Sequence, residues 1–365
     1  MTTNPLIRLG QLGQSPWYDF ITRDLVTSGE LARLIAEDGL RGMTTNPTIF
    51  EKAIAGSELY DDDIRRLAAE GRRPSEIFEA LAVEDVQAAC DLFQPIYRES
   101  KGLDGLVSME VAPTLAHDSA GTIAEAERLW SRIARPNVMI KIPGTREGLP
   151  AITHCLAQGI NVNVTLLFSV ERYRGVVEAF LSGLEQRKAR GAAIGGIASV
   201  ASFFVSRVDG KVDALVGATD LKSRAAIANA CAAYAAFEEL LGSARWKMLA
   251  AAGAIVQRPL WASTSTKDPK LPDVYYVEAL IGDLTVNTLP PVTFAAYRDH
   301  GKPALRIHDG MADAAVTLRR LAESGIQLSG ITAALETEGV ASFAASFASL
   351  LKVIEQKAAA LAPTA

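Results

Sequence analysis

The chain has 365 residues, 49% of them hydrophobic, and a formal net charge of -5 from 37 Lys and Arg against 42 Asp and Glu. This length allows one large α/β barrel as well as two domains. With no basic excess, nothing indicates a nucleic acid or an anionic membrane as a partner. A phosphorylated substrate would therefore have to be held by a few local cations.

The cysteines and the hydropathy pattern exclude several further classes. The three cysteines, Cys90, Cys155 and Cys231, are widely spaced and form no CxxC pair, which argues against a disulfide framework or a thiolate metal site. Residues 1–15 lack the features of a secretory signal, and no stretch reaches about 18 uninterrupted apolar residues. Residues 225–252 come closest to a membrane span, but charged residues interrupt them at helical spacing. We expect a soluble, cytoplasmic protein.

Short β-rich runs alternate with longer helical patterns along nearly the whole chain, which predicts βα units around a parallel sheet. Residues 138–140 are apolar on consecutive positions, as in strands covered on both faces. We predict a single (β/α)8 barrel (TIM barrel) domain over residues 1–365, with its core at about 15–325 and an additional C-terminal helix at about 329–358. The eight expected strands are 17–21, 42–45, 106–111, 138–142, 162–167, 197–205, 254–262 and 284–289.

Polar residues at the ends of these strands are the first candidates for a site, since active sites of such barrels lie at the carboxyl ends of the strands. Asp19 and Glu110 each end an apolar strand. Two carboxylates beside an amine would suit imine chemistry, which requires several proton transfers. Taken individually, either carboxylate could equally be a structural partner of an arginine or a helix cap.

Lys141 lies in an otherwise apolar strand, within Asn-Val-Met-Ile-Lys-Ile-Pro-Gly-Thr at 137–145. A charged ammonium is costly in such a place without a partner. Burial favours the uncharged amine, which can attack a ketone and form an imine. The structural alternative is a lysine that reaches from a strand end to a carboxylate.

Two further segments present hydrogen-bonding side chains. Thr45 and Asn46 lie in Thr-Thr-Asn-Pro at 44–47, where they could contact a substrate or simply cap the next helix. Polar and apolar side chains alternate in Asn-Val-Asn-Val-Thr at 161–165, so that Asn163 and Thr165 would share one face of a strand.

A long apolar strand ends in hydroxyl groups and an arginine, Ser202 and Arg207, a combination suited to a phosphate. The alternative is a surface arginine at a strand end. Lys267, after Trp-Ala-Ser-Thr-Ser-Thr, is a weaker second candidate cation. Only four histidines occur and none lies in a His-x-x-x-His arrangement, so we expect no metal site.

Four of these segments together resemble the transaldolase family. They follow the family's order: Thr-Thr-Asn-Pro at 44–47, the lysine strand at 138–142, Asn-x-Thr-Leu-Leu-Phe-Ser at 163–169 and Ser-x-Phe-Val-x-Arg at 202–207. The resemblance covers roughly residues 17–289. The segment Asn-Pro-Thr-Ile-Phe-Glu-Lys at 46–52 is similar to a long bacterial-type subtype.

The resemblance implies catalytic roles for four residues. Lys141 would form the Schiff base, and Glu110 with Thr165 would hold the catalytic water. Asp19 would be the acid/base at the hydroxyl where the C–C bond breaks. The family's two acidic residues lie closer together than Asp19 and Asp24 do, and Asp19 is preferred because Asp24 falls beyond the strand.

The resemblance also implies a substrate site. Asn46, Asn163 and Thr45 would contact the sugar, with Phe204 beside them, and Ser202 and Arg207 would bind its phosphate. Lys267 would be the second phosphate ligand, although the segment before it has extra residues compared with the family pattern.

The implied reaction is the cofactor-free transfer of a dihydroxyacetone unit between sugar phosphates of the pentose phosphate pathway, by a monomer or a homodimer. Two alternatives stay open. A fructose-6-phosphate aldolase would resemble this chain throughout, but those enzymes have Gln where this chain has Glu110 and Tyr where it has Phe204. A barrel that binds sugar phosphates without catalysis is the other, since a fold alone does not establish activity.

Overall fold

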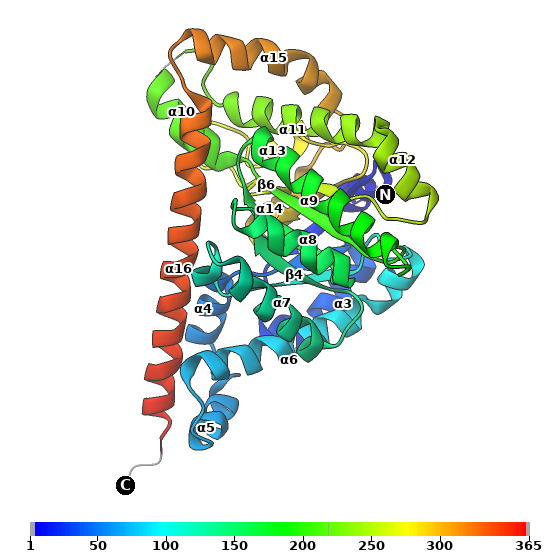
Figure 1. Cartoon of the computed structure of the whole chain (residues 1–365). Coiled ribbons are helices and arrows are strands. Elements are labelled where there is room, and N and C mark those ends of the chain that lie inside the picture. The colour runs from blue at the N-terminus through cyan, green and yellow to red at the C-terminus, as the bar shows by residue number, and fades with distance from the viewer. Residues whose placement is uncertain (1–3, 218, 363–365) are drawn as a thin grey trace.

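Eight parallel strands close into a barrel in the order β1 to β8, which confirms the predicted fold class (Figure 1). The computed structural model describes residues 4–217 and 219–362. Each strand pairs in parallel with the next, and β8 pairs with β1. The strands are β1 Gln14–Asp19, β2 Gly42–Thr44, β3 Leu106–Glu110, β4 Val138–Pro143, β5 Val162–Leu167, β6 Ser199–Phe204, β7 Arg258–Ala262 and β8 Thr285–Leu289.

Strand boundaries differ from the predictions mainly where polar side chains lie inside the barrel. β1 begins at Gln14, three residues before the predicted start at 17. Gln14 is fully buried, and its Nε2 donates to the Leu280 carbonyl at 2.7 Å and to Thr285 Oγ1 at 3.0 Å. A polar residue satisfied in this way belongs to the barrel core without contributing to an apolar pattern.

Helices surround the barrel, as the periodicity of the intervening segments predicted (Figure 1). Before β4 they are α1 Pro5–Gln11, α2 Arg23–Thr27, α3 Glu30–Glu37, α4 Pro47–Ala55, α5 Asp61–Ala69, α6 Pro74–Glu99, the 3-10 turn η1 Pro113–Leu115 and α7 Ser119–Ile133. After β4 they are α8 Gly148–Gln158, α9 Val170–Ala189, α10 Ser206–Val216, α11 Ala225–Gly242, α12 Ala244–Ala251, α13 Tyr275–Ala279, α14 Pro291–His300, α15 Ile307–Glu323 and α16 Leu328–Ala360.

The last helix, α16, is the predicted C-terminal helix, and it runs along one side of the barrel past α10, α4 and α5 (Figure 1). Polar contacts fix it to the N-terminal half of the chain: Thr48 donates to Ser346 at 2.8 Å, and Lys357 pairs with Asp61 at 2.6 Å. The helix also contacts β5 and η1. Residues near the end of the chain are thereby placed over the carboxyl end of the barrel.

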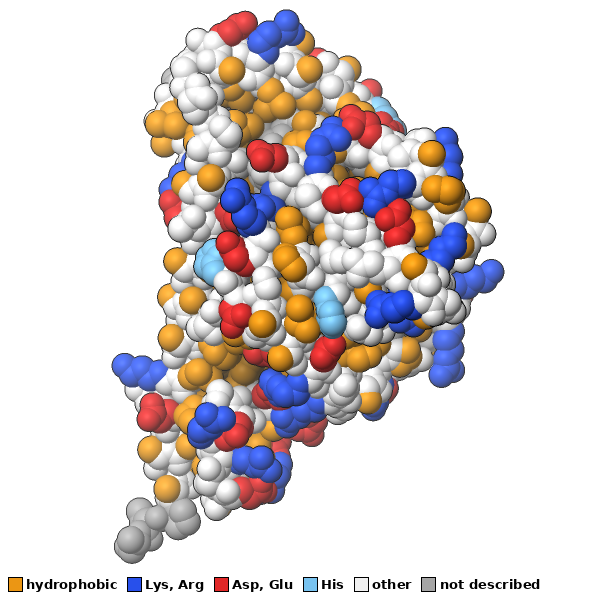
Figure 2. Space-filling model, viewed as in Figure 1, with side chains coloured by type: hydrophobic (Ala, Val, Ile, Leu, Met, Phe, Trp, Pro, Cys, Tyr) orange, Lys and Arg blue, Asp and Glu red, His pale blue; other side chains and the backbone are white. Residues whose placement is uncertain are grey.

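Two sequence-based expectations about apolar segments have different outcomes. All three cysteines are buried and free, as predicted. The expectation that residues 225–252 come closest to a membrane span was wrong, because Ser243 interrupts them and caps α12. Among the described residues, only α16 is long and apolar enough to cross a membrane by length and composition, a criterion that helices of soluble proteins also meet. Charges of both signs are interspersed over the face of the molecule seen in Figure 2.

Candidate active site

Lys141 lies near the carboxyl end of β4 with only 6% of its side chain exposed. Its Nζ donates to the Thr45 carbonyl at 3.0 Å and lies 3.5 Å from Glu110 Oε2. On its other side, Nζ is 5.6 Å from the ring centre of Phe343, a residue of α16. The amine is thus buried with one carboxylate partner and an aromatic cover.

The strand register explains how the neighbours of Lys141 are positioned. Glu110 on β3 and Asn163 on β5 are the register partners of Lys141, so three polar side chains follow one another around the barrel wall. Asn163 is fixed in turn, because its Nδ2 donates to Ser108 Oγ at 2.9 Å and its Oδ1 accepts from Ser202 Oγ at 2.7 Å. Closure of the barrel therefore orients this row of side chains.

Glu110 is the most perturbed group near the amine. Its side chain is 4% exposed, and neither carboxylate oxygen has a hydrogen-bond partner among the described residues. At 3.5 Å the contact with Lys141 is an ion pair and not a well-formed hydrogen bond. Burial raises the pKa of Glu110 from 4.5 to about 7, although the charge of Lys141 opposes the rise. Both protonation states of this carboxyl are therefore populated near neutral pH.

Asp19, the last residue of β1, is the second carboxylate of the site. It accepts a hydrogen bond from Thr44 Oγ1 at 2.7 Å. Burial raises the pKa of Asp19 above its ordinary value, and Lys141 and the bond from Thr44 oppose this rise. By contrast, Asp24 lies in α2 and is exposed. The geometry therefore brings Asp19, and not Asp24, to the amine.

A cavity of about 200 Å³, the Lys141 cavity, opens at the carboxyl ends of the strands. The sequence-predicted residues Thr165, Phe204 and Arg207 lie in its wall. Its described lining residues are Asp19, Thr44, Asn46, Lys141, Thr165, Ser202, Phe204, Arg207, Ala262, Ser263, Ser265, Thr288, Pro290 and Phe343. Sequence reasoning missed Ser263, Ser265, Thr288 and Phe343.

Arg207 supplies the positive charge in the wall of this cavity. It begins α10 directly after the β6 segment, and its guanidinium lies 5.5 Å from the centre of the Phe204 ring. Burial lowers the pKa of Arg207, and Glu338 of α16 opposes this. Lys267 is exposed and is not among the described residues that line the cavity. The hydroxyl groups of Ser263 and Ser265 occupy the wall instead.

Thr45 and Asn46 have structural contacts as well as places near the site. Thr45 Oγ1 donates to the Ser108 carbonyl at 2.9 Å, and its own carbonyl accepts from Lys141. Asn46 Oδ1 accepts from the backbone N–H of Ile49 at 3.0 Å and so caps α4. The capping alternative is therefore correct for Asn46, but the residue also lines the Lys141 cavity.

Two non-glycine residues beside the cavity have left-handed backbone conformations. Leu166 has φ 61° within an irregularity of β5, directly after Thr165, and Ser263 has φ 56° directly after β7. Such conformations are uncommon for residues with a Cβ and are concentrated at functional sites, where a bulge re-aims a side chain. Thr165 Oγ1 has no hydrogen-bond partner among the described residues, like the Glu110 carboxylate.

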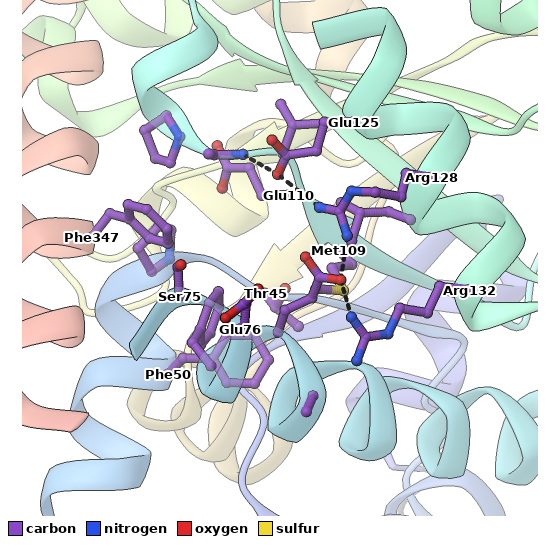
Figure 3. Close-up of a pocket in the computed structure, with 18 of the residues that line it drawn as sticks. Thr45, Phe50, Ser75, Glu76, Met109, Glu110, Glu125, Arg128, Arg132 and Phe347 are labelled. Atoms are coloured by element: carbon purple, nitrogen blue, oxygen red, sulfur yellow. Dashed lines mark hydrogen bonds and ion pairs between the residues drawn. The ribbon is translucent and has the colours of Figure 1, made fainter. Parts of the chain in front are cut away.

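A larger cavity of about 550 Å³, the Glu110 cavity, lies beside the first (Figure 3). Phe50, Phe78 and Phe347 contribute an aromatic wall, with successive ring centres 5.4 Å and 5.7 Å apart. Its described lining residues are Thr45, Asn46, Pro47, Phe50, Leu67, Arg72, Arg73, Ser75, Glu76, Phe78, Glu79, Ala80, Met109, Glu110, Val111, Ala112, Pro113, Glu125, Arg128, Leu129, Arg132 and Phe347. Asn46 lines both cavities.

The family model for transaldolase/fructose-6-phosphate aldolase matches residues 16–354. This chain belongs to that family. The chain is 49% identical over 362 residues to a transaldolase of Parafrankia sp. (strain EAN1pec), with 97% of this chain and 98% of the relative covered. It is 46% identical over 379 residues to a transaldolase of Trichodesmium erythraeum, with both chains covered completely. A transaldolase of Acidothermus cellulolyticus is 50% identical over 360 residues, with 96% of each chain covered.

The family assignment agrees with the four motifs that the sequence presented, and the motif residues surround one amine. Within the described residues, no group of three or more His, Cys, Asp and Glu side chains is arranged to hold a metal ion. What this site offers a substrate is a buried amine, two carboxyls with raised pKa values and a half-buried guanidinium.

Proposed function

We propose that this protein is a transaldolase that moves a dihydroxyacetone unit from sedoheptulose 7-phosphate to glyceraldehyde 3-phosphate, giving erythrose 4-phosphate and fructose 6-phosphate. The single observation that carries the proposal is the buried Lys141 amine 3.5 Å from an otherwise unpartnered Glu110 carboxylate. An amine in this setting can form an imine with the donor ketone.

Glu110 is suited to the proton transfers of imine formation. With its pKa raised to about 7, a substantial fraction is protonated at neutral pH and can give its proton to the departing hydroxyl of the carbinolamine. The unpartnered Thr165 hydroxyl and the Glu110 carboxylate together provide a donor and acceptors for the water that this step releases. These two residues would therefore hold the catalytic water.

Asp19 is the candidate acid/base for breaking the C–C bond. Its raised pKa makes its carboxylate a better proton acceptor than an exposed aspartate, and the hydrogen bond from Thr44 fixes one oxygen. After cleavage, the electron pair is delocalised onto the protonated imine of Lys141. The Phe343 ring over the amine helps to keep water away from this intermediate, which favours transfer over loss of the three-carbon unit.

The substrate phosphate would bind at Arg207. The Ser202 hydroxyl already donates to Asn163, so its role is to orient that amide, which can then meet a sugar hydroxyl. Ser263 and Ser265 are better placed than Lys267 to add neutral donors for a phosphate, because they line the cavity and Lys267 does not. The Nδ2 group of Asn46 is a further candidate contact for a sugar hydroxyl.

A fructose-6-phosphate aldolase is the second candidate, because the matched family model includes that activity. The resemblance noted for Glu110 and Phe204 favours the transaldolase, and the full-length relatives cited above carry that name. We further infer a one-domain, cytoplasmic enzyme that needs no cofactor and acts as a monomer or homodimer on sugar phosphates.

Trapping with borohydride tests this function directly. The protein is incubated with fructose 6-phosphate and borohydride, and the adduct is mapped by mass spectrometry, with Lys267→Ala as a matched control. A reduced three-carbon adduct on Lys141 in both proteins is expected. Addition of erythrose 4-phosphate in place of borohydride then separates the candidates, since a transaldolase forms sedoheptulose 7-phosphate while an aldolase releases free dihydroxyacetone. No adduct on Lys141 would refute the mechanism.

A further inference from the structure

The two cavities meet at the pair formed by Lys141 and Glu110. Lys141 lines the smaller cavity and Glu110 lines the larger one, while their charged atoms are 3.5 Å apart. Glu110 is not among the described residues that line the Lys141 cavity. The proton donor of imine formation therefore faces a different chamber from the amine that it serves.

Imine formation needs a way out for water. When the carbinolamine C–O bond breaks, the electron pair leaves with the oxygen, a proton from Glu110 completes a water molecule, and the nitrogen lone pair forms the C=N bond. Hydrolysis of the product imine reverses each change and returns the proton to Glu110. The balance requires only that one water leaves and one returns.

The front of the site is poorly suited to this traffic. A sugar phosphate joined to Lys141 and held by Arg207 spans the cavity of about 200 Å³, and Phe343 covers the amine. The Glu110 cavity, at about 550 Å³, has room for a chain of waters, each of which takes about 30 Å³. It also stays free of the substrate in this geometry.

The walls of the Glu110 cavity combine a weakly interacting surface with a second carboxyl. Phe50, Phe78 and Phe347 offer few hydrogen bonds to hold water. Glu125 accepts a hydrogen bond from the backbone N–H of Ala112 at 3.0 Å, and it lies in the same chamber as Glu110 (Figure 3). Burial also raises the pKa of Glu125, so this carboxyl can carry protons between the chamber and its surroundings.

We infer that the Glu110 cavity is a separate route by which the water of imine formation leaves and re-enters the site while the sugar phosphate occupies the Lys141 cavity. This inference builds on the proposed function, since it needs imine chemistry at Lys141. It assigns to the larger cavity a purpose that substrate binding does not supply.

Filling the cavity tests the route. Ala80 lines the Glu110 cavity from α6, so Ala80→Phe narrows the chamber without altering a group that handles substrate. Ala124→Phe is the matched control, because Ala124 is exposed on α7 and does not line either cavity. Ala80→Leu, a smaller change, replaces Ala80→Phe if the latter lowers the thermal unfolding midpoint.

The measurement compares two rates in each protein: incorporation of ¹⁸O from labelled water into C2 of fructose 6-phosphate, and three-carbon transfer to erythrose 4-phosphate. If water is trapped, it re-adds to the same imine and the original oxygen is retained. The ratio of exchange to transfer should fall at least about fivefold in the Ala80 variant and stay unchanged in the control.

Two results would overturn the route. An unchanged ratio in the Ala80 variant means that water leaves through the Lys141 cavity, and a proportional fall of both rates means that the substitution disturbs the site as a whole. Borohydride trapping in the same proteins separates this failure from a failure of the proposed function. An adduct on Lys141 with an unchanged ratio refutes only the route, whereas no adduct in the unsubstituted protein refutes the imine mechanism.

Discussion

Replacing Glu110 by Gln should stabilise the fold above neutral pH while removing most of the activity. Gln has nearly the same shape as a protonated Glu but cannot ionise. The folded protein raises the pKa of Glu110 from 4.5 to about 7, so it holds this proton more tightly than the unfolded chain does. The stability of the unsubstituted protein therefore falls as pH rises from about 4.5 through 7.

The size of the effect follows from the same pKa change. Each pKa unit corresponds to about 1.4 kcal/mol, so ionisation of Glu110 in the folded state costs roughly 3 kcal/mol by pH 8. Glu110→Gln removes this cost. The substitution should raise the free energy of unfolding by up to about 3 kcal/mol at pH 8 relative to its effect at pH 4.5.

Urea unfolding at pH 5 and pH 8 measures this difference, provided that the dependence on urea is the same for all variants. Glu58→Gln is a matched control, because Glu58 is exposed and its substitution should have the same small effect at both pH values. Equal effects of Glu110→Gln at the two pH values, or a loss of stability at pH 8, would contradict the argument that burial of this carboxyl dominates its energetics.

Three other substitutions address the amine, the phosphate and the aromatic cover. Lys141→Met should abolish turnover and the borohydride adduct while circular dichroism stays unchanged, and residual transfer would point to another amine. Arg207→Ala should raise KM for phosphorylated donors about ten- to hundredfold, the range expected for a charge-assisted contact, whereas Lys267→Ala should leave KM unchanged in the same steady-state assay. Phe343→Ala should increase the fraction of three-carbon units released as free dihydroxyacetone, and an unchanged fraction would show that the ring does not shield the intermediate.

The sequence alone determined the architecture. Apolar strands separated by helical periodicity require a parallel sheet covered by helices, and all eight strands were located from that pattern. Local chemistry also singled out Lys141, because an ionisable residue in an apolar strand is costly wherever that strand is packed. The start of β1 was missed because Gln14 satisfies its polar atoms inside the barrel, and no local pattern reveals such distant partners.

The tertiary structure decided which of the candidates share a site. The choice of Asp19 over Asp24 depends on the pairing of β1 with its neighbours, which places only Asp19 beside the amine. The wall of Ser263 and Ser265 depends on the backbone after β7, where the serine at 263 has a left-handed conformation. Phe343 is brought to Lys141 by the packing of α16 across the barrel. Residues far apart in the chain become neighbours only through barrel closure and helix docking, so local sequence could name the reacting amine but could not define its chamber.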